Sequence, residues 1–109
     1  MATKANLIID QGTTYATSIN ITNENDEIID LTGCTGYAQI RKHYTSSNAV
    51  SFSVAIDPND GLVTLGLTAN QTSTMTAGRY VYDVEIVDAA NVVSRILEGI
   101  VTVTPQATR

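Results

Sequence analysis

The chain has 109 residues, a formal net charge of -5 and a pI near 4.5. Its length predicts one domain over residues 1–109, with a core that needs no disulfide or metal to be stable. The single cysteine, Cys34, excludes an intrachain disulfide. Because the negative charge opposes binding to phosphate groups, we expect no nucleic-acid partner.

Two features of the sequence bear on where the protein is found. No stretch approaches the roughly 18 apolar residues that cross a bilayer, so no membrane partner is expected. The start of the chain also lacks the apolar run of a signal peptide. We therefore expect the protein to be made in the cytoplasm.

Alternating apolar and polar residues predict strands in the first part of the chain. An early strand is expected over 4–9, and a second over 15–21, where Tyr15, Thr17, Ile19 and Ile21 share one face. A weaker alternation follows over 36–44. These segments are separated by polar turn sequences.

A hairpin and a crossover are expected in the middle of the chain. Strands over 50–56 and 63–67 flank Asp57-Pro-Asn-Asp-Gly61, which has the composition of a turn. Residues 68–76 show no period-2 pattern, which predicts one short helical turn that carries the chain across to the next strand.

The strand expected over 79–87 carries four apolar or aromatic side chains on one face. Tyr80, Tyr82, Val84 and Ile86 alternate with acidic residues, so this strand is predicted to be half-buried. About seven strands at short spacing predict an all-β fold, an immunoglobulin-like antiparallel sandwich. The predicted core is Ile19, Ile40, Phe52, Val54, Leu65, Tyr80, Tyr82, Val84 and Ile86.

Two tyrosines have specific expected places in such a sandwich. Tyr80 matches the tyrosine whose hydroxyl returns to nearby backbone at the start of the sixth strand. Tyr82 then occupies the position of the second cysteine of the inter-sheet disulfide, and Ile19 is predicted to face it. The alternative is that Tyr80 or Tyr82 forms an exposed aromatic contact site.

Few residues offer catalytic or metal chemistry. His43 is the only histidine and is predicted to lie at an exposed strand end, within the basic cluster Arg41-Lys42-His43. Cys34 has no basic neighbours in the sequence and is expected to be a small buried or half-buried residue. We therefore expect no catalysis, no cofactor and no bound metal. Weak calcium binding by the acidic loop over 23–27 stays open as an alternative.

The final segment, 92–103, is apolar on both faces. Val92, Ile96 and Ile100 form a second apolar row beside Val93, Leu97, Val101 and Val103. A bulge at Gly99 would exchange the faces and explain part of this excess. Otherwise the row predicts an assembly interface, together with an extended tail over 105–109 that ends at Arg109.

Several motifs resemble those of small tailed-phage virion proteins. They include Asp30-Leu-Thr-Gly33, Ala38-Gln-Ile-Arg41, Ala77-Gly-Arg-Tyr-Val-Tyr-Asp-Val-Glu85 and the ending from Gly99 to Arg109. The chain especially resembles proteins related to the N-terminal domain of upper baseplate proteins of the receptor-binding module. The resemblance implies a multimeric virion protein whose partners are other virion proteins and copies of itself. Its place is the baseplate, the tail, a fibre attachment or the capsid surface.

Two other functions were weighed against this resemblance. Sandwich domains also bind carbohydrates or host surfaces through loops, and the candidate loops are 23–30 and 44–48. Tyr44 is the one aromatic residue on them. A hydrolase built on His43 is the least favoured because it would rest on one residue.

Overall fold

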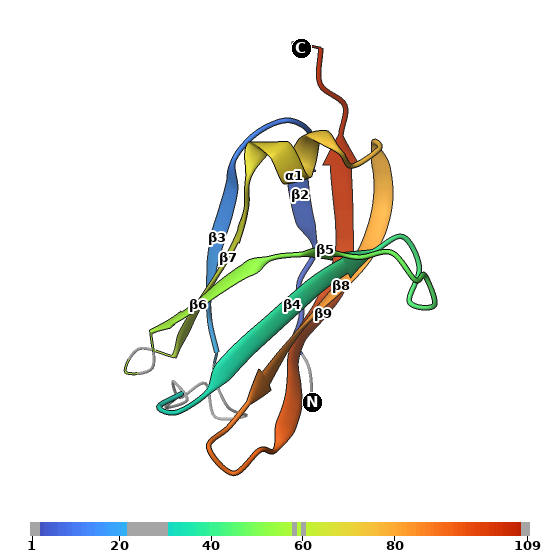
Figure 1. The fold of residues 1–109 in the computed structure, drawn as a ribbon. Coiled ribbons are helices and arrows are strands. Elements are labelled where there is room, and N and C mark those ends of the chain that lie inside the picture. Colours follow the sequence, from blue (N-terminus) through green and yellow to red (C-terminus); the bar gives the residue numbers. More distant parts are fainter. Residues whose placement is uncertain (1–2, 22–30, 58, 60, 108–109) are drawn as a thin grey trace.

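The computed structural model describes residues 3–21, 31–57, 59 and 61–107, and it shows two β-sheets packed face to face (Figure 1). The strands are β1 (Thr3–Lys4), β2 (Leu7–Asp10), β3 (Tyr15–Asn20), β4 (Thr35–Arg41), β5 (Val50–Ser51), β6 (Ser53–Asp57), β7 (Leu62–Leu67), β8 (Gly78–Val87) and β9 (Val93–Thr104), and the helix is α1 (Ala69–Ser73). This architecture confirms the predicted all-β, immunoglobulin-like sandwich. No helix in the described ranges is long and apolar enough to cross a membrane.

The larger sheet has six strands, and its N-terminal edge is parallel to its neighbour. The order is β1-β9-β8-β4-β5, with β2 also paired to β9. β1 and β2 run parallel to β9 in one continuous register, in which Thr3 lies opposite Leu97 and Leu7 opposite Val101. They are therefore one interrupted edge strand. The sequence predicted this strand but not its parallel pairing.

The smaller sheet has three antiparallel strands in the order β3-β7-β6. The segment over 50–57 passes from one sheet to the other, because β5 pairs with β4 while β6 pairs with β7. Phe52 lies at the change of sheet, where its N–H donates to the Ala38 carbonyl at 3.0 Å. Counting interrupted strands as single stretches, the nine strands form seven, as the sequence predicted.

The core lies between the two sheets and contains every predicted core residue at least in part. Ile40, Phe52, Leu65, Tyr82 and Val84 are buried, whereas four others are partly buried against them: Ile19, Val54, Tyr80 and Ile86. The core also contains buried residues outside the prediction, namely Leu7, Ile9, Ile21, Leu31, Ala38, Val63, Leu67, Met75, Leu97, Val101 and Val103. The N-terminal strand thus supplies more of the core than its short sequence pattern indicates.

The crossover from β7 to β8 contains the predicted helical turn. Thr68 caps α1: its hydroxyl accepts from the Gln71 N–H at 3.1 Å, and the Gln71 side chain accepts from the Thr68 N–H at 2.9 Å. Thr72 is fully buried, and its hydroxyl donates to the Thr13 carbonyl at 2.7 Å. The helix is therefore fixed to the β2–β3 connection.

Tyr80 occupies its predicted place after the crossover. Its hydroxyl donates to the Thr76 carbonyl four residues earlier, at 2.6 Å. The Lys42 ammonium lies 4.8 Å from the centre of its ring. Tyr80 therefore fixes the turn that leads into β8, as a tyrosine at this position does in related sandwiches.

Tyr82 joins three parts of the core. Its ring packs edge-on against Phe52, with centroids 6.1 Å apart. That Ile19 also faces it stays a prediction. Its hydroxyl donates at 2.6 Å to the carbonyl of Ala5, which lies in the interruption between β1 and β2. Gly99 is its neighbour on β9, and a Cβ at that glycine would collide with the same carbonyl.

We predict that Tyr82→Phe lowers the free energy of unfolding by about 1–3 kcal/mol, because it leaves the Ala5 carbonyl without its donor in a partly buried place. Tyr80→Phe is the matched control, since it removes a hydroxyl bond of equal length at an exposed position. It should cost less, because water can replace the lost donor at Thr76. Urea unfolding of both variants measures the difference, and equal losses would contradict the importance of the Ala5 contact.

We also predict that stability falls at alkaline pH. Burial raises the pKa of Tyr82 to about 12 from an ordinary value of 10.0, and the nearby Tyr15 adds to the rise. Between these values the unfolded chain loses the Tyr82 proton while the folded chain keeps it, so the free energy of unfolding decreases as pH increases. The contribution is complete below pH 10. Urea unfolding across this range should show a shallower decline for Tyr82→Phe than for Tyr80→Phe.

Candidate interaction surface

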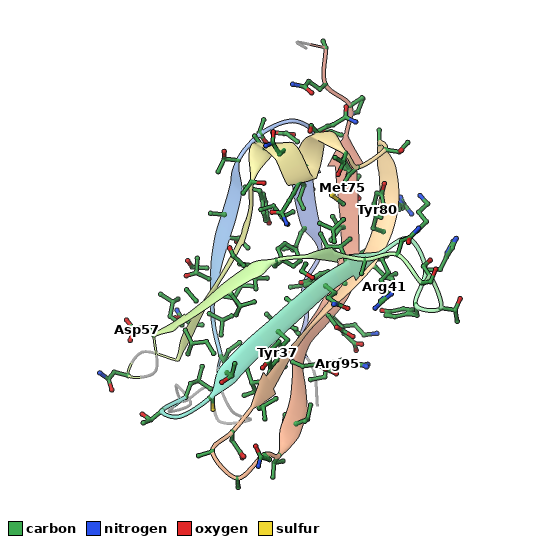
Figure 2. The ribbon with its side chains drawn as sticks, viewed as in Figure 1. Tyr37, Arg41, Asp57, Met75, Tyr80 and Arg95 are labelled. Atoms are coloured by element: carbon green, nitrogen blue, oxygen red, sulfur yellow. The ribbon has the colours of Figure 1, made fainter. Side chains whose placement is uncertain are left out.

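The solvent-facing side of the larger sheet carries most of the features that suit a partner. We call this side the outer face. Strand alternation and the registers of β4, β8 and β9 define its members: Ile8, Tyr37, Gln39, Arg41, Val81, Asp83, Glu85, Val87, Val93, Arg95, Glu98 and Ile100. Figure 2 shows Tyr37, Arg41 and Arg95 along this sheet, with Asp57 at the end of the sandwich opposite Met75 and Tyr80.

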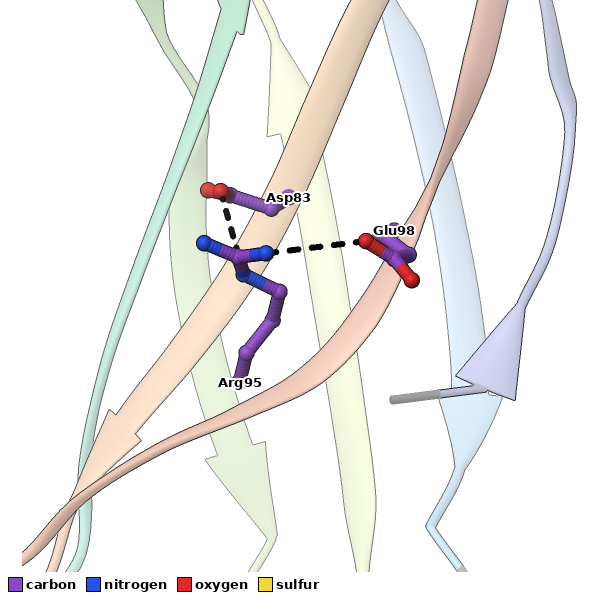
Figure 3. Close-up of polar contacts among 3 residues, drawn as sticks. All are labelled: Asp83, Arg95 and Glu98. Atoms are coloured by element: carbon purple, nitrogen blue, oxygen red, sulfur yellow. Dashed lines mark ion pairs between the residues drawn. The ribbon is translucent and has the colours of Figure 1, made fainter. Parts of the chain in front are cut away.

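A band of charges of both signs crosses the outer face. The Arg95 guanidinium lies between two carboxylates, with Nε 3.4 Å from Asp83 Oδ2 and Nη1 3.6 Å from Glu98 Oε2 (Figure 3). Lys4 lies opposite Glu98 on the edge strand, and Glu85 lies opposite Arg95. The two ion pairs of Arg95 are partly exposed to solvent, so each adds little to stability. They give the band a fixed pattern of charge that a partner can match.

Apolar side chains lie on both sides of this charged band. On one side, Ile100 is 41% exposed and pairs with Val81. On the other, Val93 is 58% exposed and pairs with Val87, and Tyr37 is also 58% exposed. Large apolar side chains that remain this exposed on one face are typical of a contact surface.

Tyr44 stands between two shallow depressions on the outer face. It belongs to the loop after β4 and is 60% exposed. One depression, of about 340 Å³, is lined by Tyr44, Val81 and charged residues that include Arg41 and Arg95. The other, of about 510 Å³, is lined by Tyr44, Val81 and Ile100 together with polar residues of the edge strand. The Tyr44 ring thus contributes to both.

A bulge in β9 decides which of its side chains reach the outer face. Val84 lies opposite Leu97 but Glu85 lies opposite Arg95, which leaves Ile96 as the extra residue. The bulge is therefore at Ile96, three residues before the glycine at which the sequence suggested it. As a result Val93 shares a face with Ile100.

The predicted interface residues do not form one row. Val92 is 56% exposed in the turn before β9, and Ile100 is exposed on the outer face. Ile96 is half-buried and packs against the core. Arg109 lies outside the described residues. Their role in assembly stays a prediction, whereas the shared apolar row of Val92, Ile96 and Ile100 is wrong because of the bulge.

Sequence reasoning missed two residues of the surface. Tyr37 shares a face of β4 with Gln39 and Arg41 and alternates with the buried Ala38 and Ile40, a period-2 pattern that could have placed it outside the core. Val93 was placed on the core face, since its outward position depends on the bulge. Tyr44, by contrast, is as exposed as the sequence predicted.

The other residues considered for chemistry are held by their own surroundings. His43 is exposed, as predicted, and its backbone N–H donates to Ser46 Oγ at 3.0 Å. Arg41 donates to the Ser46 carbonyl, and Lys42 donates to the Arg79 carbonyl at 2.8 Å. Cys34 is half-buried against the core, as expected.

The carboxylates of two turns bear on metal binding: those of the acidic loop over 23–27 and that of Asp57 before β7. The acidic loop over 23–27 lies outside the described residues. Asp57 is exposed at the start of the β6–β7 hairpin. Among the residues that the structure describes, no three His, Cys, Asp or Glu side chains are grouped so that they could hold a metal ion.

We predict that Ile96→Asp and Ile100→Asp differ in their effect on folding. Ile96→Asp should lower the free energy of unfolding by about 2–3 kcal/mol, because it places a charge against the core. Ile100→Asp should cost less than about 1 kcal/mol, because that side chain faces solvent. Urea unfolding of the two variants tests the position of the bulge. A larger loss for Ile100→Asp would mean that the faces of β9 are reversed.

Comparison with known proteins bears on the fold. No protein-family model matches the sequence, and no curated protein matches it. Among solved structures, the chain is similar to an internalin-like protein of Listeria monocytogenes, with 18% identity and a TM-score of 0.50 over 94% of this chain but only 28% of that one. It is also similar to the Lin-41 filamin domain, with 11% identity and a TM-score of 0.48 over 89% of this chain and 82% of that one. At 18% identity, the likeness to the internalin-like protein concerns the fold alone.

Proposed function

We propose that this protein is a non-enzymatic assembly module that binds a protein partner through the outer face of its larger sheet. The observation that carries the proposal is the arrangement of Ile100, Val81 and Tyr44 beside the Asp83–Arg95–Glu98 charge band. Apolar contacts would supply most of the binding energy. The charge pattern would select the partner and its orientation.

The rigidity of the outer face supports this role. β4, β8 and β9 are paired over their length, so the side chains on them are held in fixed relative positions. Arg41 also ties the loop that carries Tyr44, through its bond to the Ser46 carbonyl. A surface that is already ordered loses little conformational entropy when it binds.

The setting that we propose is the virion of a tailed phage, where the module would join other virion proteins in the baseplate, tail, fibre attachment or capsid. The sequence resemblance described above supports this setting. The fold is compatible with it but does not select it, because β-sandwiches serve many functions.

The test is the incorporation of variants into particles. Ile100→Asp should reduce the copy number in purified virions at least tenfold, because it places a charge in the apolar part of the contact. Ala55→Asp is the matched control, since it adds the same charge at an exposed position of β6 on the smaller sheet. It should be incorporated like the original chain. Quantitative mass spectrometry of the particles measures both.

Two results would contradict the proposal. Equal incorporation of Ile100→Asp and Ala55→Asp would show that the outer face is not the contact. Absence of the original chain from purified particles would show that the virion is the wrong setting.

A carbohydrate- or host-surface-binding role is the second candidate function. The observation in its favour is that Tyr44 is exposed beside Gln39, Arg41 and Asp83, with Tyr37 exposed elsewhere on the same face, because sugars stack on aromatic rings and bond to such polar groups. The predicted loop over 44–48 supplies one of these tyrosines. Glycan-array binding that is lost in Tyr44→Ala would favour this candidate over the first.

A further inference from the structure

Within the residues that the structure describes, the strand β3 is an open edge of the smaller sheet. It pairs with β7 on one side, and it is the terminal strand in the order β3-β7-β6. In Figure 1 it forms one outer border of the sandwich, with β7 on its inner side. An open strand edge presents unpaired N–H and C=O groups, which form a template for another strand.

The other sheet edges have features that hinder pairing, and β3 has none. β5 has only two residues. The edge formed by β1 and β2 is interrupted at Ala5 and carries Lys4 and Asp10. β6 ends at Asp57, which is followed by a proline in the sequence. In contrast, β3 reads Tyr-Ala-Thr-Ser-Ile-Asn over six residues, without charge or proline, and pairs with β7 without a bulge.

The directions of the backbone groups on β3 follow from its pairing with β7. The Ile21 N–H donates to the Gly61 carbonyl at 2.8 Å and continues the same register. Because successive residues of a strand alternate in direction, the odd-numbered residues bond to β7. The N–H and C=O groups of Ala16, Ser18 and Asn20 therefore point to the open edge, and none of them bonds to another described residue.

The core-facing side chains of β3 are incompletely covered at this edge. Tyr15, Thr17 and Ile19 are only half-buried, although they point inward. Val63 and Leu65, which lie opposite Ile19 and Thr17 on β7, are fully buried. Of the described strands only β7 pairs with β3, so a further strand on its other side would add to the burial of these side chains.

We propose that the occupant of this edge is β3 of a second copy, paired antiparallel about a two-fold axis through Thr17. In this register Tyr15 lies opposite Ile19 of the second copy, and the two Thr17 residues lie opposite each other. Aromatic pairs with β-branched residues and Thr–Thr pairs are both favourable across strands. Ala16 and Ser18 of the two copies exchange the backbone bonds. The two smaller sheets become one continuous sheet of six strands.

Charge favours a second copy at this edge. Each chain carries a net charge of -5, so most surfaces of two copies repel each other. β3 is neutral, and the solvent side of the smaller sheet contains small or neutral residues with one charge, at Asp57 on its far strand. Two copies can therefore meet here without placing carboxylates opposite each other. The contact is distinct from the outer face, so each can fail independently.

The test is the substitution Ser18→Pro in the full chain. The Ser18 N–H points to the open edge, so proline removes a donor for the second copy but no bond to β7. Ser18→Ala is the matched control, because it loses the 2.9 Å contact with the Thr64 hydroxyl but keeps the N–H. A single strand pair buries less than a standard interface, so dimers should appear between about 10 µM and about 1 mM.

In sedimentation equilibrium, the original chain and Ser18→Ala should shift toward the dimer mass as concentration rises, whereas Ser18→Pro should stay monomeric with an unchanged circular dichroism spectrum. In the original chain, hydrogen exchange at the Ala16 and Ser18 amides should slow as the protein concentration rises into the range where dimers form. If Ser18→Pro unfolds, Ser18→Lys replaces it, because it keeps the backbone but places two like charges near the axis.

A monomeric original chain at about 1 mM, or a dimer that persists in both Ser18→Pro and Ser18→Lys, would overturn the proposal. Ile100→Asp should dimerise like the original chain. Loss of dimers in that variant alone would move the contact between copies to the outer face. The incorporation of the chain into particles is a separate result from its dimerisation, since incorporation is expected to depend on Ile100 and not on Ser18.

Discussion

The hydrogen bond from Tyr82 to the Ala5 carbonyl is the contact on which the arrangement of the larger sheet depends. The bond lies beside Gly99, the one position on β9 where the absence of a side chain lets the N-terminal segment approach this closely. The Ile100 N–H donates to the Asn6 side chain at 3.1 Å beside it. Together these bonds give partners to the Ala5 carbonyl and the Asn6 side chain in the interruption between β1 and β2. The N-terminal strand can then bury Leu7 and Ile9 in the core.

The bulge at Ile96 links the core to the surface. Ile96 and Leu97 are consecutive, yet both pack against the core. Residues before the bulge therefore lie on the opposite face from the one that simple alternation with the residues after it would give. Arg95 is thereby placed where it meets Asp83 and Glu98, and Val93 is turned outward. One extra residue therefore produces both the charge band and part of the apolar surface. The chemistry of the outer face depends on this irregularity as much as on residue type.

Local patterns predicted the parts of the structure that local interactions determine. The helical turn at Ala69–Ser73, the Tyr80 bond to Thr76 and the β6–β7 hairpin all join residues close in sequence. The parallel pairing of β2 with β9 and the change of sheet at Phe52 join distant segments, and no local pattern encodes them. Gly99 was singled out as a possible bulge, which is wrong because the extra residue is Ile96. The function of Gly99 is close approach, which becomes visible only once Ala5 is placed beside it.

The parallel pairing of β2 and β9 has a mechanical consequence. Tension applied between the N-terminal side of β2 and the C-terminal side of β9 pulls two parallel neighbours in opposite directions along their length. The bonds in the register from Leu7–Val101 to Asp10–Thr104 then carry the load together, in shear. An antiparallel terminal pair would open one bond at a time from its end. A domain connected in this way resists being pulled apart through its ends, which is a useful property in a component that transmits force.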